Sequence, residues 1–467
     1  MNRSKIKFLI AGAVVSVQLF GPSAFSTMER VNAAELDGKV TVEETVQAKN
    51  SIAEDGVSDE ITGADVDSIK ENIKNDDELS SKEKAVLNQL VESEKNIAVE
   101  EVKNDSQEEA VAQFEKVETN ATTQAAVVLC DDTKIDYLNF NLDAIHISED
   151  NYVEDMKNIV EPYIDSRKET GYINGVDNAQ LYYEKYYNAD AIGNIVISHG
   201  FTENLEKYNE MIYYFLNNGY NVFGIEHRGH GRSGSLGVQD STQIHVNNFD
   251  DYVNDLKTFM DEVVVPNSDN KKVFLYAHSM GGAIGAKFLE DNPEYFNASI
   301  LTSPMLEINT GKIPEDLARI ISKAAILFGQ GGKYAAGQGP YNPNERFEDA
   351  STSCESRYNY ISEIKKENPE FQKGGGSYKW LYECLSKTKQ ITSKNNASKV
   401  ETPVLLFQAE KDDLVRPKGQ NDFAKYAKDC TLERVSDSKH EVYFEKDSVQ
   451  KNYLHKVFDF FKKHLFN

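Results

Sequence analysis

Short apolar runs alternate with helical patterns along the last two thirds of the chain. The runs are too short and too continuously apolar to be surface helices, and several are bounded by Gly, Asn or Pro, as is typical of buried strands. The alternation predicts a mainly parallel sheet with helices on both faces. We predict strands at 194–198, 221–225, 272–277, 298–302, 404–408 and 431–435, with helices at 207–218, 249–264, 280–291 and 418–428.

The alternation is interrupted between residues 303 and 402. These hundred residues contain helical patterns, a Gly-rich turn at 374–376 and the only Trp of the chain, Trp380. A structureless loop of this length is uncommon in a compact domain. We therefore expect an inserted, mainly helical cap at about 303–402, over the carboxyl edge of the sheet, where open α/β folds bind their ligands.

The pattern of residues 1–33 is that of a secretory signal peptide. Basic residues precede an apolar run at 8–20, and small residues follow at Ala33 and Ala34. The run is shorter than the roughly 20 residues that a membrane-spanning helix needs. We expect cleavage near Ala33, and a mature protein that is secreted or associated with the cell envelope.

Residues 34–136 form an acidic arm with few aromatic side chains. Between Glu35 and Leu129 there are 24 acidic residues against nine Lys, and Phe114 is the only aromatic residue. Such a segment has little with which to build a core, so we expect it to be disordered or partly helical. A spacer or pro-segment is favoured over a specific binding module. We expect the folded domain, with the inserted cap, at 137–467.

Charge and composition argue against a nucleic-acid partner and against a disulfide-built scaffold. The net charge of −25 and the absence of Lys and Arg patches argue against nucleic acid. The four Cys residues are too few for a disulfide-built scaffold, and packing is their expected role. No protein partner is inferred.

Neither a metal nor an organic cofactor is expected. His227 and His230 lie three residues apart in the segment 226–233, but glycines interleave them and no ligand-bearing helix is apparent. We interpret this segment as a hydrogen-bonded loop that borders the ligand pocket expected at the carboxyl edge of the sheet. The chain has no phosphate-binding Gly-Lys-Ser/Thr loop and no dinucleotide fingerprint.

The predicted strand at 272–277 runs into Ala277-His278-Ser279-Met280-Gly281-Gly282 and then into a helical pattern. A Ser between small residues at a strand-to-helix turn is typical of a nucleophile elbow, whose sharp turn leaves the hydroxyl exposed. Ala277 takes a small position where Gly is more usual. The alternative is a Ser that only caps the helix. We predict that Ser279 is a nucleophile.

Two partners for this serine follow in the order expected for the fold, acid and then His. A turn with carboxylates follows the strand at 404–408, and His440 follows the short strand at 431–435. We predict that His440 takes the proton from Ser279, and that Asp412 orients the imidazole and stabilises its protonated form.

The neighbouring Asp413 is the alternative acid. Asp412 is preferred because a spacer and then the apolar Leu414 and Val415 follow it, and these would anchor the turn while the carboxylate points to the site. Asp413 would then face solvent.

Acyl transfer also needs amide donors for the developing oxyanion. Met280, after the nucleophile, supplies one. Gly200 lets the backbone turn after the strand at 194–198, so that the amide of Phe201 can supply the other. His199 is interpreted as a structural residue.

These residues resemble the bacterial lysophospholipase and monoacylglycerol lipase branch of the α/β-hydrolase superfamily. The resemblance extends from about Met156 to the C-terminus, roughly two thirds of the chain. The resemblance rests on the segments 277–282, 226–233, 439–441 with 444–447, 303–305, 356–358 and the Gly-rich turn before Trp380-Leu381. Within the segment 226–233, Glu226 occupies a position where that branch usually has Asp.

By that resemblance the fold is an α/β-hydrolase fold, and the substrate is a small lipid ester, a lysophospholipid or a monoacylglycerol, with transient contact with a membrane or micelle surface. An apolar cap over a Ser site would give an acyl chain somewhere to bind. Simple short-chain esters would satisfy the same catalytic residues. A general carboxylesterase, a peptidase and a non-catalytic secreted binding protein on the same fold remain as alternatives.

Overall fold

The computed structural model describes residues 70–76, 79, 81, 84–85, 87–88, 142–188 and 191–465. The predicted signal peptide and most of the acidic arm lie outside these residues. The chain divides into two compact units, Met1–Gln124 with Lys323–Gly331, and Ala125–Ser322 with Gly332–Asn467. In the first unit the described residues 70–75 are helical, and so are the described positions between 81 and 88.

The second unit is built on an eight-stranded sheet with the order β1-β2-β4-β3-β5-β6-β7-β8. The pairs β1–β2 and β2–β4 are antiparallel, and all other neighbours are parallel. The strands are β1 Lys168–Asn174, β2 Gln180–Tyr186, β3 Gly193–Ser198, β4 Tyr220–Ile225, β5 Val273–His278, β6 Ala298–Thr302, β7 Val404–Ala409 and β8 Cys430–Val435.

Helices follow most of the strands, as the alternating pattern predicts. The α-helices are α6 Leu142–Ile145, α7 Tyr152–Asp155, α8 Glu161–Asp165, α9 Asn209–Asn217, α10 Asp250–Phe259, α11 Ser279–Asp291, α12 Glu315–Leu327, α13 Glu355–Glu367, α14 Tyr378–Ile391, α15 Lys394–Ala397, α16 Pro417–Tyr426 and α17 Asp447–Leu465. π-helical turns at Met156–Val160 and Met260–Val264 continue α7 and α10. Short 3₁₀ turns lie at Val176–Asn178, Leu205–Tyr208, Gly231–Ser233, Val265–Asn267, Phe347–Asp349, Pro369–Phe371 and Val442–Phe444. No helix among the described residues has the length and apolar character needed to cross a membrane.

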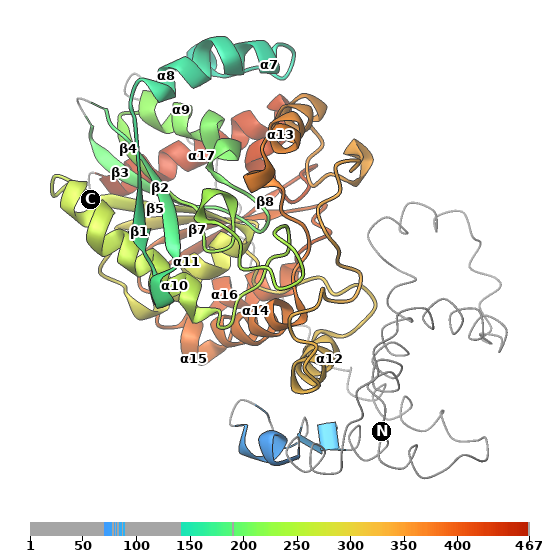
Figure 1. Cartoon of the computed structure of the whole chain (residues 1–467). Helices are drawn as coiled ribbons and strands as arrows, with labels where there is room; N and C mark the ends of the chain where they lie inside the picture. The colour runs from blue at the N-terminus through green and yellow to red at the C-terminus, as the bar shows by residue number, and fades with distance from the viewer. Residues whose placement is uncertain are drawn as a thin grey trace, which may run out of the picture. The chain divides into compact units, whose positions relative to one another are not determined.

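Helices cover both faces of the sheet, with α9 and α17 on one face and α10, α11 and α16 on the other (Figure 1). The central strands are buried throughout, and successive side chains of one strand join opposite cores. In β3, Ile195 and Ile197 pack with α9 and α17, whereas Val196 packs with α10 and α11. Side chains of a strand alternate between the two faces of the sheet, and here both faces are covered by apolar helices. The strand therefore appears in the sequence as a continuous apolar run. The predicted α/β-hydrolase fold class is confirmed.

The hairpin of β1 and β2 was not predicted. β1 is an edge strand of mixed polarity, and its side chains are partly or fully exposed. In β2 the apolar positions are interrupted by Glu184, which is nevertheless buried and accepts hydrogen bonds from Tyr182 (2.9 Å) and Tyr186 (2.5 Å). A glutamate that is buried because tyrosines donate hydrogen bonds to its carboxylate cannot be recognised from the pattern of apolar residues.

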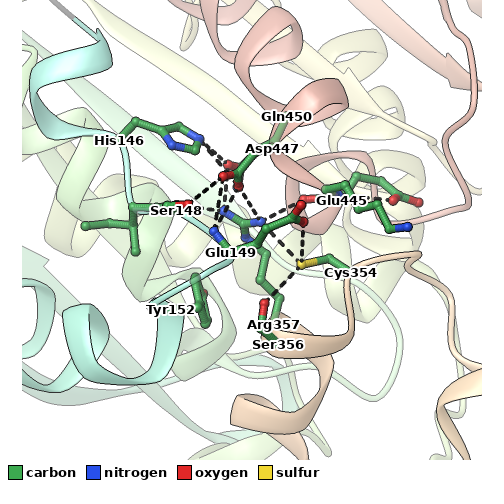
Figure 2. A network of polar contacts seen from close by, with 12 residues as sticks. His146, Ser148, Glu149, Tyr152, Cys354, Ser356, Arg357, Glu445, Asp447 and Gln450 are labelled. Carbon is green, nitrogen blue, oxygen red and sulfur yellow. Dashed lines mark hydrogen bonds and ion pairs between the residues drawn. The ribbon is translucent and has the colours of Figure 1, made fainter.

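Arg357, in the first turn of α13, is fully buried and joins segments that are distant in the sequence (Figure 2). It binds Glu210 of α9 in a bidentate ion pair, with Nε–Oε2 at 3.0 Å and Nη2–Oε1 at 2.9 Å. Its Nη1 donates to Asp447 (3.1 Å), the first residue of α17, and to the carbonyl oxygen of Glu445 (2.9 Å). Its Nη2 also donates to the carbonyl oxygen of Ile147 (3.0 Å). The guanidinium thus fixes α13 to α9, to α17 and to the segment before β1.

Replacing Arg357 by Met should strongly destabilise the second unit. The substitution leaves the Glu210 carboxylate buried without its partner, and breaking a buried ion pair in this way costs about 3 to about 5 kcal/mol. The free energy of unfolding, measured by urea titration, should fall by that amount. Arg346→Gln, which removes an exposed ion pair with Asp349, serves as the control and should leave the unfolding midpoint close to that of the wild type. Equal midpoints for the two variants would contradict the proposed role of Arg357.

Candidate active site

Ser279 lies at the turn between β5 and α11, where the backbone adopts a left-handed conformation with φ 51°. This conformation is uncommon for a residue with a side chain and is found where a tight turn must present a functional group. Gly281 permits the turn, because a Cβ at that position would lie 2.2 Å from the carbonyl oxygen of Ser198 at the end of β3. The start of α11 is therefore pressed against the end of the neighbouring strand.

The structure brings Ser279, His440 and Asp412 together at the carboxyl edge of the sheet. Ser279 follows β5, Asp412 follows β7 and His440 follows β8. The hydroxyl of Ser279 lies 2.8 Å from Nε2 of His440, and Nδ1 of His440 lies 2.7 Å from Oδ2 of Asp412. All three side chains are buried or nearly so. This is the geometry of a serine nucleophile, its base and the carboxylate that orients the base.

The turn after β7 aims Asp412, rather than Asp413, at His440. The second carboxylate oxygen of Asp412 accepts hydrogen bonds from the amides of Leu414 and Val415, both at 3.0 Å. Burial alone would raise the pKa of Asp412, but the imidazole of His440 and these two amides outweigh burial and lower it. The carboxylate is therefore held ionised beside the imidazole.

The surroundings of His440 favour its protonated form. Burial alone would lower the pKa of His440, but the carboxylate of Asp412 outweighs burial and raises it, with smaller contributions from Glu441 and Glu203. His278 packs against it with ring centroids 4.9 Å apart. Burial lowers the pKa of His278 to about 4. This neighbour is therefore neutral at ordinary pH and adds no positive charge that would oppose protonation of His440.

The oxyanion hole predicted from the sequence involves the backbone amides of Met280 and Phe201. Met280 is the second residue of α11, and the first amides of a helix have no acceptor within it. The amide of Phe201 donates to no acceptor in the described part of the chain. The adjacent Gly200 amide is held by the carboxylate of Glu203 at 2.6 Å, which fixes the turn after β3.

A buried charge cluster that the sequence did not reveal joins this turn to the loop that carries His440. Besides the Gly200 amide, the carboxylate of Glu203 accepts hydrogen bonds from Tyr208 (2.7 Å) and Tyr443 (2.9 Å). The ammonium of Lys207 lies 2.8 Å from Glu203 and 2.6 Å from Glu441, the residue after His440. Burial alone would raise the pKa of Glu203, but the charge of Lys207 holds it well below its ordinary value.

The loop 226–233 is held by side-chain hydrogen bonds. Glu226 is fully buried, and burial raises its pKa to about 7 although Arg232, 2.9 Å away, acts in the opposite direction. His199 donates from Nδ1 to the carbonyl oxygen of Gly200 (2.8 Å) and accepts at Nε2 from the amide of His227 (2.9 Å). These contacts match the structural role expected for His199.

The family model described as serine aminopeptidase, S33, matches residues 189–447, which is more than half of the chain. The chain therefore belongs to this family of α/β-hydrolases.

Individual relatives refine the comparison. The chain is 31% identical over 290 residues to the probable lysophospholipase L2 of Haemophilus influenzae, in a match that covers 62% of this chain and 90% of the relative. It is 33% identical over 300 residues to lysophospholipase L2 of Escherichia coli, with 62% and 86% covered. A soluble variant of monoglyceride lipase from Saccharomyces cerevisiae has the same fold, with a TM-score of 0.50, 18% identity and coverage of 64% of this chain and 96% of that one. The protein is thus a serine hydrolase similar to lysophospholipases and monoacylglycerol lipases.

We predict opposite outcomes for the two neighbouring aspartates. Asp412→Asn should lower kcat on a soluble p-nitrophenyl ester by about 10⁴, the loss found when a triad aspartate is replaced in other serine hydrolases. Asp413→Asn should keep kcat within about twofold of the wild type, because His440 is bonded to Asp412 and Asp413 is exposed. A large loss in Asp413→Asn alone would show that the acid has been assigned to the wrong residue.

The pH dependence should report the raised pKa of His440. The imidazole must be neutral to accept the proton of Ser279, so kcat/KM should rise with pH through a pKa above the 6.5 of an unperturbed imidazole. Asp412→Asn removes the largest cause of the increase in the pKa of His440. The pH profile of the variant's residual activity should therefore have its midpoint at a lower pH than that of the wild type. A pH-rate profile of both proteins measures this shift, and an unchanged or higher midpoint in the variant would contradict it.

Proposed function

We propose that the protein is an exported lipid-ester hydrolase that releases a fatty acid from a lysophospholipid or a monoacylglycerol through a Ser-His-Asp acyl-enzyme mechanism. The hydrogen-bonded chain from Ser279 through His440 to Asp412, at the carboxyl edge of an α/β-hydrolase sheet, carries the chemical part of the proposal. The similarity to lysophospholipases in two bacteria supports the substrate class. The signal-peptide pattern of residues 1–33 supports export.

In the first half of the reaction, His440 removes the proton from Ser279 as the serine oxygen attacks the ester carbonyl. The amides of Phe201 and Met280 donate to the oxyanion that forms. His440 then gives its proton to the departing alcohol oxygen, and the carbon–oxygen bond of the ester breaks. The acyl group is left on Ser279, and the glycerol-bearing alcohol leaves.

In the second half, water replaces the alcohol. His440 removes a proton from the water as it attacks the acyl-enzyme carbonyl, and the same two amides hold the oxyanion. The proton passes to Ser279 as the acyl–serine bond breaks. The products are the free fatty acid and the original enzyme, and Asp412 keeps the imidazole oriented throughout.

Apolar side chains beside the oxyanion turn support an acyl chain in the substrate. The ring of Phe201 packs on Trp380 of α14, with centroids 4.3 Å apart. Trp380 comes from the 303–402 segment, which carries α12 to α15 and which we propose acts as the cap. A wall of this kind can bind the acyl chain while the ester carbonyl lies at the amides.

Fatty-acid release from a lysophospholipid, a monoacylglycerol and a short-chain ester tests the proposal. The wild type should prefer one of the long-chain lipids, and Ser279→Ala should lose activity by about 10⁶ because loss of a triad serine removes the nucleophile. Ser235→Ala, at an exposed serine, should match the wild type. Wild-type activity in Ser279→Ala would refute the mechanism. A preference for the short-chain ester would favour a general carboxylesterase, and no turnover of any ester would favour a binding protein.

A further inference from the structure

A cavity of about 300 Å³ lies beside the proposed oxyanion turn and the loop that carries His440. Phe201 and Thr202 line it from the turn, and Glu441 and Phe444 line it from the His440 loop. Its opposite wall includes residues of α13, among them Lys365. The cavity thus borders both loops, and none of its charged groups reacts with the ester in the proposed mechanism.

Lys365 reaches this cavity because α13 is fixed at its other end. Arg357, Ile361 and Lys365 are spaced four residues apart and therefore share one face of the helix. Arg357 is held by the network of Figure 2, and Ile361 is buried in the core that includes α9 and α17. The same inward face then carries Lys365 to the cavity.

The ammonium of Lys365 differs from those of the other lysines that line the cavity. Lys207 is paired with two carboxylates at 2.8 and 2.6 Å, and Lys366 is paired with Glu363 at 2.7 Å. Lys365 makes no ion pair or side-chain hydrogen bond with any residue that the structure describes. Burial and the charge of Lys207 lower its pKa, although Glu441, Glu203 and Glu345 act in the opposite direction. An anion bound beside Lys365 would supply the missing partner.

The remaining charges of the cavity limit what kind of anion fits. The carboxylates of Glu203, Glu345, Glu363 and Glu441 also line it, so it is not a uniformly basic pocket. Such surroundings disfavour a dianion, and they suit a group with one negative and one positive charge. A phosphodiester with an attached amine, as in an ethanolamine or choline headgroup, has this combination.

We propose that this cavity is a headgroup subsite, in which Lys365 binds the phosphodiester of a lysophospholipid and the carboxylates of the cavity stabilise its amine. The subsite rests on the proposed ester hydrolysis for its purpose, and it assigns the substrate as a zwitterionic lysophospholipid rather than a monoacylglycerol. The glycerol backbone then spans from the amides of Phe201 and Met280 to the cavity.

Kinetics on matched substrates test the subsite. Lysophosphatidylethanolamine and a monoacylglycerol with the same acyl chain should be compared for the wild type, Lys365→Gln and Lys394→Gln. Lys365→Gln should lower kcat/KM on the lysophospholipid by about tenfold to about a hundredfold, as expected for loss of one charged hydrogen bond. On the monoacylglycerol it should stay within about twofold of the wild type. Lys394→Gln removes the same charge from an exposed position outside the cavity and should change neither substrate.

A binding measurement separates failure of the subsite from failure of the proposed function. Glycerophosphoethanolamine, which has the headgroup but no ester to cleave, should bind Ser279→Ala in calorimetry and should not bind the double variant with Lys365→Gln. Equal binding by the two proteins, or none by Ser279→Ala, overturns the subsite even if esters are hydrolysed. Headgroup binding that depends on Lys365 supports the subsite even if no ester is turned over. Equally strong binding of inorganic phosphate would overturn the headgroup assignment, because it would show a site for phosphate from any source.

Discussion

The left-handed backbone at Ser279 is the constraint on which the rest of the site depends. A residue with φ 51° between a strand and a helix is stable only when the surroundings hold the turn closed. Here β5 is buried between two parallel neighbours, and α11 packs so closely on the end of β3 that Gly281 has no room for a side chain. The same close approach places the first amides of α11 beside the turn that contains Phe201. One steric constraint thus positions both the proposed nucleophile and the amides proposed to bind the oxyanion.

Buried charge pairs hold the loops around this rigid centre. Glu203 and Lys207 connect the turn after β3 with the loop of His440, and their hydrogen bonds offset the cost of removing both charges from water. Arg357 performs a similar role further out, where it fixes α13 to α9 and α17. Ion pairs of this kind require defined positions of donor and acceptor atoms. They therefore specify one arrangement of the loops, whereas apolar contacts would allow several. The cavity proposed to bind the headgroup is lined by Glu203 and Lys207 and by residues of α13, and Lys365 is the one lysine lining it that lacks a partner among the described residues.

Much of the fold was predictable because the five central strands, β3 to β7, are buried between helices and therefore appear in the sequence as short apolar runs. The serine and histidine of the site were predictable as well, since a nucleophile elbow needs small neighbours at fixed spacing and the base follows a late strand. The hairpin of β1 and β2 was missed because an edge strand needs few apolar residues and Glu184 interrupts the pattern of its partner. Glu203, Lys207 and Arg357 were missed for a related reason. A charged residue in an amphipathic segment has the same appearance in a sequence whether it faces water or a buried partner.

The sequence by itself determined the class of fold, the order of the strands that carry chemistry, and Ser279 and His440 as candidates, because these depend on local residue size and periodicity. The tertiary structure decided which of two adjacent aspartates meets the imidazole. Residues 412 and 413 are both aspartates, so their side chains do not distinguish them. The amides of Leu414 and Val415, together with the position of β8 beside β7, orient Asp412 toward His440. It also decided which charges are buried and paired, because pairing depends on the packing of segments that are far apart along the chain.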